Sequence, residues 1–153
     1  MTNTGYSIDT NTILTAWNET YRPTSFGSFW TKLGELIAAG RAFASDQVLI
    51  ELSRKDDDAH VWAKSQAGFS VPLEEEQTLI AKKLVNTQPA LAKQRLGRLR
   101  ADGFVIALAK WKGLVVVTAE NRRGPEKIPN ICDAAGVTCI ALADMIESEG
   151  WKF

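Results

Sequence analysis

The sequence predicts an α/β protein in which the strands of a parallel sheet alternate with helices. The clearest strand is the β-branched run 114–118, which follows a glycine and is apolar at nearly every position, as in a sheet covered on both faces. After it, a helical pattern at 128–135, a short strand at 137–140 and a final helix at 142–149 follow one another at the spacing of crossover connections. The 153 residues, 45% of them hydrophobic and 24% charged, are typical of one globular domain with a sizeable core.

The first forty residues predict one strand and two helices. Residues 6–8 form the short strand. Apolar residues then recur at helical spacing as far as Tyr21, which predicts a helix that begins near Thr12. A second amphipathic helix is predicted over 26–37, and Gly40 ends it.

A short strand and two helices are expected next. The apolar stretch 41–44 predicts a buried strand. Ser45 is suited to cap the N-terminus of a helix over 46–55, because its hydroxyl can accept from a free backbone N–H. The acidic run 56–58 either ends that helix or starts the next one, which is predicted at 59–67.

Three helices are predicted in the middle of the chain. The acids at 74–76 favour the start of a helix that runs to about Leu84, since negative charge stabilises a helix N-terminus. A basic helix is predicted at 89–100, and another helix at 103–112 has an apolar side that includes Trp111. We therefore predict a single domain over the whole chain, with a helical insertion at roughly 56–100.

The zero net charge conceals a basic middle segment. Residues 1–81 carry six Lys/Arg and eleven Asp/Glu, whereas residues 82–127 carry eleven basic and three acidic side chains. Residues 128–153 carry one basic and four acidic side chains. The balance argues against a protein that coats nucleic acid unspecifically, but the middle segment can hold a phosphate backbone. Solvated helix faces are the alternative interpretation of this segment.

The N-terminal segment, the cysteines and the one histidine argue against secreted, membrane-spanning and histidine-dependent proteins. Met1–Gly5 lacks the charged start of a signal peptide, and no apolar run is long enough for a membrane span, so we expect no membrane contact. Cys132 and Cys139 form no disulfide framework, so we expect a protein of the reducing cytoplasm, and both are expected to be small buried residues. His60 is the one histidine, which argues against zinc sites and serine-histidine triads.

Four acidic residues lie where a parallel sheet can bring them to one edge. Asp9 follows the first strand, Glu51 lies in the helix after the second, Asp102 starts a helix, and Glu120 follows the strongest strand by two residues. Clustered carboxylates repel one another unless a cation shares the site, and oxygen-only ligands suit Mg²⁺ or Mn²⁺. The pattern therefore predicts a metal site, and repulsion within it predicts that Asp9→Asn stabilises the fold.

Each of these acids also has a plainer interpretation. Asp9 and Asp102 could be turn or capping residues, and Glu120 could be a solvated loop acid. Glu51 stands four residues before Lys55, as in an exposed helical ion pair.

At these residues the chain resembles the PIN domain family, in its branch of VapC-like toxin ribonucleases. The segment 7–11 resembles the opening motif of a strand followed by Asp, Thr or Ser, and Asn. Residues 48–52 resemble the helix of the second acid, and 101–109 the Asp before an Ala-rich helix. Residues 115–121 resemble the strand that ends in Thr-x-Asp, with Glu120 where Asp is usual.

The resemblance implies a three-layer α/β/α sandwich, helix-rich, around a central parallel sheet of four or five strands. It implies metal-dependent hydrolysis of RNA phosphodiester bonds. Asp9, Glu51 and Asp102 would be the ligands of Mg²⁺ or Mn²⁺, with Glu120 as the fourth acid. Side chains that orient the carboxylates would be Asn11, Thr118 and, beside Glu120, Asn121.

The same resemblance implies the partners of the protein. The basic stretch would position RNA, through these residues: Lys93, Arg95, Arg98, Arg100, Arg122 and Arg123. A toxin role would add a small antitoxin that blocks the site and a homodimer as the active unit. A non-catalytic PIN-like binding or scaffold protein, which keeps the fold without the metal, remains the alternative function.

Overall fold

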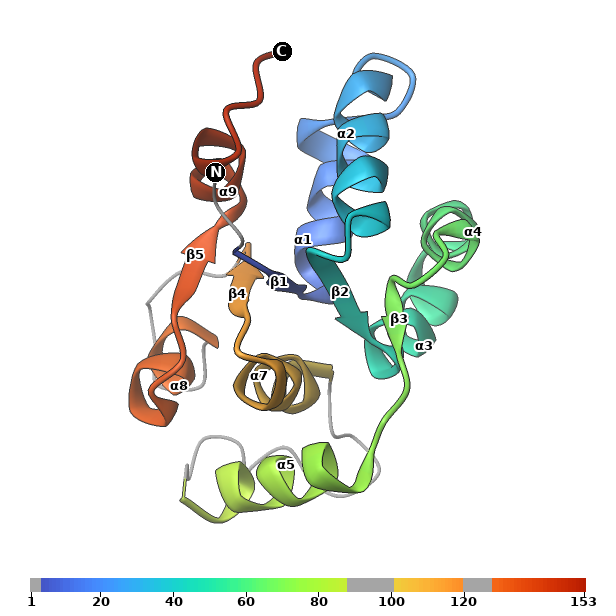
Figure 1. Cartoon of the computed structure of the whole chain (residues 1–153). Coiled ribbons are helices and arrows are strands. Elements are labelled where there is room, and N and C mark those ends of the chain that lie inside the picture. The colour runs from blue at the N-terminus through green and yellow to red at the C-terminus, as the bar shows by residue number, and fades with distance from the viewer. Residues whose placement is uncertain (1–3, 88–100, 120–127) are drawn as a thin grey trace.

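A central sheet of five parallel strands organises the structure, a computed structural model that describes residues 4–87, 101–119 and 128–153 (Figure 1). The strand order is β3-β2-β1-β4-β5, so the first strand of the chain lies at the centre. The five strands are β1 (Tyr6–Ile8), β2 (Ala42–Ser45), β3 (Ser70–Val71), β4 (Val115–Thr118) and β5 (Cys139–Ala141). The α/β class and the parallel sheet are confirmed.

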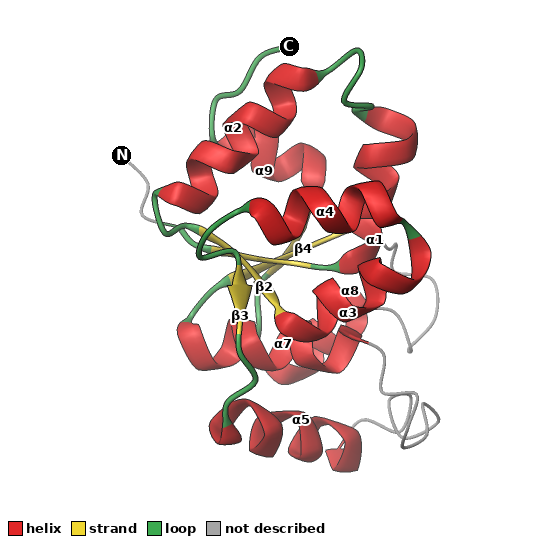
Figure 2. Ribbon diagram, turned by 90° about the vertical axis from the view of Figure 1, so that its right-hand side faces the viewer, coloured by secondary structure: helices red, strands yellow, loops and turns green. Residues whose placement is uncertain are grey.

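Helices cover both faces of this sheet, as a parallel sheet requires. In Figures 1 and 2, α1, α2 and α9 lie on one face and α7 and α8 on the other, with α5 outside α7. The helices are α1 (Thr10–Thr15), its π-helical continuation η1 (Ala16–Thr20), α2 (Gly27–Ala38), α3 (Asp46–Lys55), α4 (Asp57–Ser65), α5 (Glu75–Thr87), α7 (Ala101–Lys112), α8 (Ile128–Ala135) and α9 (Leu142–Ser148). The three-layer sandwich is therefore confirmed, and the basic helix predicted at 89–100 lies outside the described residues.

The parallel register places the carboxyl ends of the central strands at one edge. Tyr6 pairs with both Ala42 and Val115, which aligns β1 with its two neighbours. The Asp9 N–H, directly after β1, donates to the Val117 carbonyl at 3.2 Å and so extends the pairing with β4. The helices α1, α3 and α9 begin directly after β1, β2 and β5 or one residue later, and so start from this edge.

Side-chain caps account for two helix starts that differ from the prediction. The first helix begins at Thr10 and not near Thr12, because the Asp9 carboxylate accepts from the Thr12 N–H and caps it. Asp56 caps α4 in the same way by accepting from the Ala59 N–H, so that helix begins at Asp57. The acidic run therefore starts a helix, which was the second of the two alternatives.

Three tryptophans, one each from η1, α2 and α4, form a cluster in the core. The Trp30 ring lies 4.8 Å from the rings of both Trp17 and Trp62, measured between centroids, in edge-to-face contacts. The buried indole N–H of Trp30 donates to the Tyr21 carbonyl at 2.6 Å. The end of η1 is thereby fixed against α2.

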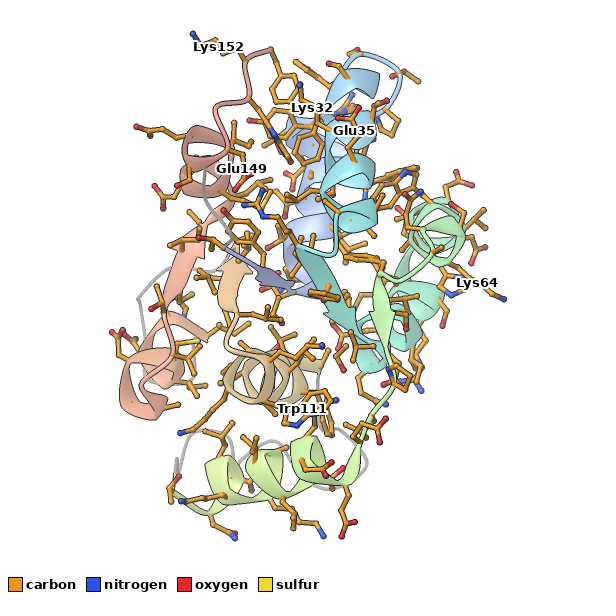
Figure 3. All side chains as sticks on the ribbon, viewed as in Figure 1. Lys32, Glu35, Lys64, Trp111, Glu149 and Lys152 are labelled. Carbon is orange, nitrogen blue, oxygen red and sulfur yellow. The ribbon has the colours of Figure 1, made fainter. Side chains whose placement is uncertain are left out.

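The expectation that Trp111 lies on a buried side of its helix is wrong. Residues 103–109 of α7 are all buried, because the sheet covers one side of the helix and α5 packs on the other. The exposed residues of α7 lie in its last turn, where Trp111 is 39% exposed (Figure 3). The apolar pattern along this helix reflects burial on all sides and not a single apolar face.

A polar cluster joins the chain end to the start of the sheet. The Arg41 guanidinium donates to both carboxylate oxygens of Glu149, at 2.8 and 2.6 Å, and the Tyr6 hydroxyl donates to Glu149 Oε2 at 2.6 Å. Figure 3 shows Glu149 at the end of α9, on the side of β1. Burial and hydrogen bonding to Glu149 raise the pKa of Tyr6 to about 12. Burial alone would raise the pKa of Glu149, but the hydrogen bonds from Arg41 and Tyr6 outweigh it and lower that pKa.

Candidate active site

Asp9 is a buried carboxylate held at the carboxyl edge of the two central strands. Its side chain is part of a residue only 2% exposed. Oδ1 accepts from the Thr12 N–H at 2.7 Å and the Thr12 hydroxyl at 2.6 Å, and Oδ2 accepts from the Thr118 hydroxyl at 2.6 Å. Three short hydrogen bonds thus fix the plane of the carboxylate. Asp9 is both the helix cap and the acid that the motif placed here.

Two threonines orient Asp9, and only one of them was anticipated. Thr118, at the end of β4, is 2% exposed and was expected near the carboxylates. Thr12 was not anticipated, although the spacing of three residues from Asp9 is the signature of a capping contact. Asn11, which was expected to orient a carboxylate, is exposed on α1. The described side chains that donate to Asp9 are those of Thr12 and Thr118, and the role of Asn11 stays a prediction.

Glu51 and Asp102 are brought to the same junction between α3 and α7. Glu51 Oε2 accepts from the Ala101 N–H at 3.1 Å, one residue before Asp102. Its other oxygen lies 3.8 Å from the Lys55 ammonium, so the helical ion pair is also present. Asp102 is the second residue of α7, so it lies inside the helix and is not its N-cap. Its side chain belongs to a half-buried residue.

The described acids are of the type that binds metal ions, but they do not by themselves form a complete set of ligands. Within residues 4–87, 101–119 and 128–153, no group of three or more His, Cys, Asp or Glu side chains is placed to hold an ion. Glu120 and Asn121 lie outside these ranges, as do the six basic residues expected to contact RNA.

The donor set nevertheless fits a hard divalent cation. The side chains are carboxylates, the oxygen ligands that Mg²⁺ and Mn²⁺ take. A carboxylate oxygen has two lone-pair directions, so an oxygen that accepts from one donor, as Glu51 Oε2 does from the Ala101 N–H, can also contact a cation. Beside Asp9, the Thr10 hydroxyl is buried and has no hydrogen-bond partner in the part of the chain that the structure describes.

The side chains of Cys132 and Cys139 are hydrogen-bonded to each other between α8 and β5. Cys132, on α8, is fully buried, and Cys139, on β5, is half-buried. A thiol hydrogen bond to Cys139, together with burial, raises the pKa of Cys132 far above its usual range. The expectation of a small buried residue is confirmed for Cys132.

We expect Cys132 in the folded protein to react with iodoacetamide at pH 8 at least about tenfold more slowly than an unstructured thiol, because the thiolate is the reacting form. Mass spectrometry of the alkylated peptides gives the rate for each cysteine separately. The urea-unfolded protein is the control, in which both thiols should react alike. A Cys132 rate that does not change on unfolding would contradict the buried hydrogen-bonded pair.

A family model covers nearly the whole chain. It matches residues 6–153 and is described as a domain of unknown function, DUF4411. The chain belongs to the DUF4411 family. No curated protein matches this DUF4411 chain in a sequence search.

Solved structures resemble the DUF4411 chain in fold. FitAcB from Neisseria gonorrhoeae matches with a TM-score of 0.53 and 21% identity, over 88% of this chain and 96% of that one. VapBC2 from Rickettsia felis, bound to a DNA fragment from their promoter, matches with a TM-score of 0.55 and 19% identity, over 89% of this chain and 97% of that one. The PIN-like fold that the sequence motifs predicted is confirmed.

Proposed function

We propose that this protein is a metal-dependent endoribonuclease and the toxin of a type II toxin-antitoxin pair. The observation that carries the proposal is the buried Asp9 carboxylate, which two threonines hold where the central strands of a PIN-like sheet end. A buried acid with fixed orientation at this edge is suited to ligate a cation.

Asp9, Glu51, Asp102 and Glu120 are the proposed ligands of Mg²⁺ or Mn²⁺. The ion, when bound, would activate a water and stabilise negative charge on the phosphate oxygens. Thr12 and Thr118 hold the Asp9 carboxylate in place before an ion arrives. Glu51 links α3 to the first amide of α7 and thereby keeps Asp102 beside it.

The proposed partners are an RNA substrate and a small antitoxin. Six basic residues, at 93–100 and 122–123, are proposed to contact the phosphate backbone, and a homodimer is the proposed active unit. The likeness to VapBC2 and the resemblance to VapC-like toxins support a pair of this kind. In the parts of the chain described here, no helix is both long and apolar enough to cross a membrane.

A non-catalytic PIN-like binding protein is the second candidate function. The observation that favours it is the lack of three converging metal-binding side chains among the described residues. A protein of this kind would keep the fold and bind its partner without an ion. The presence of all four motif acids in the sequence favours the nuclease.

RNA cleavage after chelation separates the two functions. The chelator-treated protein should leave a mixed-sequence RNA intact, and added Mg²⁺ or Mn²⁺ should restore cleavage. The Asp9→Asn protein, prepared identically, controls for a contaminating nuclease. Equal cleavage by both proteins, or none with either ion, would reject the nuclease and leave the binding protein.

We expect Thr118→Val to lower the cleavage rate about 10- to 100-fold, because the valine cannot donate to Asp9 and the carboxylate loses its orientation. The apparent affinity for Mn²⁺ should fall with it. Thr31→Val is the matched control, since Thr31 is exposed on α2 and its hydroxyl only returns to the Gly27 carbonyl of the same helix. If both variants keep full activity and metal affinity, Thr118 does not position the acid.

A further inference from the structure

A pocket opens between α1 with η1 and the start of α9, at the carboxyl edge of the sheet. Its volume is about 190 Å³. The residues that line it are Thr12, Thr15, Thr20, Tyr21, Ala119, Leu142 and Ala143. In Figure 1 the blue α1 and the red α9 lie on the same face of the sheet. Both helices contribute residues to the lining of the pocket. The pocket is large enough for a small rigid group and too small for a folded peptide.

The pocket shares its wall with the candidate active site. Thr12, one of the lining residues, donates its hydroxyl to Asp9 Oδ1 at 2.6 Å. Ala119, another lining residue, directly follows Thr118, which donates to Asp9 Oδ2. A group seated in the pocket therefore lies beside the chain segments that hold the proposed catalytic acid.

The lining of the pocket is better suited to an uncharged ligand with polar groups than to a charged one. None of the residues that line it is charged, so a phosphate would meet no cation there. Thr15, Thr20 and Tyr21 are among the lining residues, and a side-chain hydroxyl can donate or accept a hydrogen bond. Leu142, with the two alanines, supplies an apolar wall.

The π-helical turn η1 creates this arrangement of hydroxyls. In a π-helix the backbone bonds join residues five apart, and the Tyr21 N–H donates to the Ala16 carbonyl at 2.8 Å. The same spacing separates Thr15 from Thr20, so both come to the pocket side of one helix. A regular α-helix would turn these two residues apart, since five residues correspond to well over one turn.

We propose that this pocket receives a single nucleobase of the RNA substrate, turned out of the strand next to the phosphate that is cleaved. The inference rests on the proposed function and adds a base preference to it. Unpaired bases in RNA are recognised by hydrogen bonds to their edges and by apolar contact with their faces. The lining combines hydroxyl-bearing residues with a leucine and two alanines, so it offers both kinds of contact. The scissile phosphate stays at the acids, outside the uncharged pocket.

Nucleoside binding tests the pocket without reference to cleavage. Adenosine, cytidine, guanosine and uridine are titrated into the protein, and the methyl resonances of Thr15, Thr20 and Ala143 are followed by NMR. We expect at least one nucleoside to shift these methyls, with a dissociation constant of the order of 1 mM. Ala143→Phe, which fills the pocket from an exposed position, should raise that constant at least about tenfold. Ala38→Phe is the control, because Ala38 is exposed at the far end of α2.

Sequencing of cleavage products provides the second arm. The wild type should prefer one or two bases at a fixed position beside the cut, and Ala143→Phe should lose this preference while it still cleaves. Methyl shifts that are absent with all four nucleosides, or equal in Ala143→Phe, overturn the pocket even if RNA is cleaved. Nucleoside binding without any RNA cleavage supports the pocket and rejects the proposed nuclease instead.

Discussion

Replacing Asp9 with asparagine is expected to reduce RNA cleavage by about 1,000-fold or more, the scale of loss when a group that acts on the reacting atoms is removed. The asparagine side chain has nearly the same shape, but it carries no charge and presents one oxygen where the carboxylate presents two. It therefore cannot serve as the anionic ligand that the proposed mechanism requires. Cleavage of a labelled RNA under single-turnover conditions measures the loss.

The contacts of Asp9 reverse the effect on stability that carboxylate repulsion predicted. Thr12 donates twice to one oxygen and Thr118 once to the other, so an amide nitrogen at either position faces a donor. We expect Asp9→Asn to lower the free energy of unfolding by about 1 kcal/mol, through a weaker cap and one lost hydrogen bond. Urea unfolding of both proteins measures this difference.

Asp58→Asn is the matched control for this substitution. Asp58 is exposed in the first turn of α4, and its replacement should leave cleavage unchanged and alter stability by less than about 0.5 kcal/mol. An Asp9→Asn protein that cleaves RNA at the wild-type rate would remove Asp9 from the site. A more stable Asp9→Asn protein would show that repulsion outweighs the hydrogen bonds seen here.

Glu149→Gln is expected to destabilise the fold by about 2 kcal/mol, because hydrogen bonds to charged groups are worth more than neutral ones and Arg41 would be left without its partner. The Glu149 side chain is only 6% exposed and that of Arg41 22%, so water compensates for the loss only in part. Thermal or urea unfolding at pH 7 measures the effect. Glu147→Gln, on the exposed side of α9, is the control.

The same cluster predicts a difference in pH dependence between the two proteins. The pKa of Glu149 is lower in the folded protein than in the unfolded chain, so the folded state binds fewer protons in the acidic range. Its contribution is present above the ordinary glutamate value of about 4.3 and is lost as the pH falls through the folded value. The stability difference between wild type and Glu149→Gln should therefore shrink below pH 4. A difference that stays constant down to pH 2 would contradict the ion pair.

At the alkaline end, Tyr6 gives the opposite dependence. Its pKa is raised to about 12, so the contribution of the neutral phenol is complete below pH 10 and is lost as the pH rises toward 12. Tyr6→Phe cannot ionise at this position and should lack that part of the decline. If the wild type and Tyr6→Phe lose stability in parallel between pH 10 and 12, the phenol does not face Glu149.

Periodicity predicted most of the fold, and the exceptions depend on contacts between distant segments. The β-branched strand 115–118 and the helix α3, which Ser45 caps, could be recognised because their own residues determine them. The strand Ser70–Val71 was missed, since two residues contain no pattern and only pairing with β2 makes them a strand. The exposure of Trp111 depends on α5, which packs on α7 from another part of the chain.

The site was predictable to the extent that motifs record local contacts. Asp9 and Thr118 could be named because Asp9 directly follows a predicted strand and Thr118 ends one. Thr12 was overlooked because its role depends on Asp9 serving as a helix cap and a candidate ligand at once. The contact between Glu51 and the Ala101 N–H joins residues fifty apart, which no spacing rule reports.

Calorimetric titration of Mn²⁺ into the wild type and Asp9→Asn tests whether Asp9 belongs to a metal site. We expect saturable binding to the wild type and binding at least about tenfold weaker, or none, in the variant, because Asp9 supplies one of the charged oxygens of the site. Equal Mn²⁺ binding by the two folded proteins, or no binding by the wild type, would contradict a metal site at this edge of the sheet.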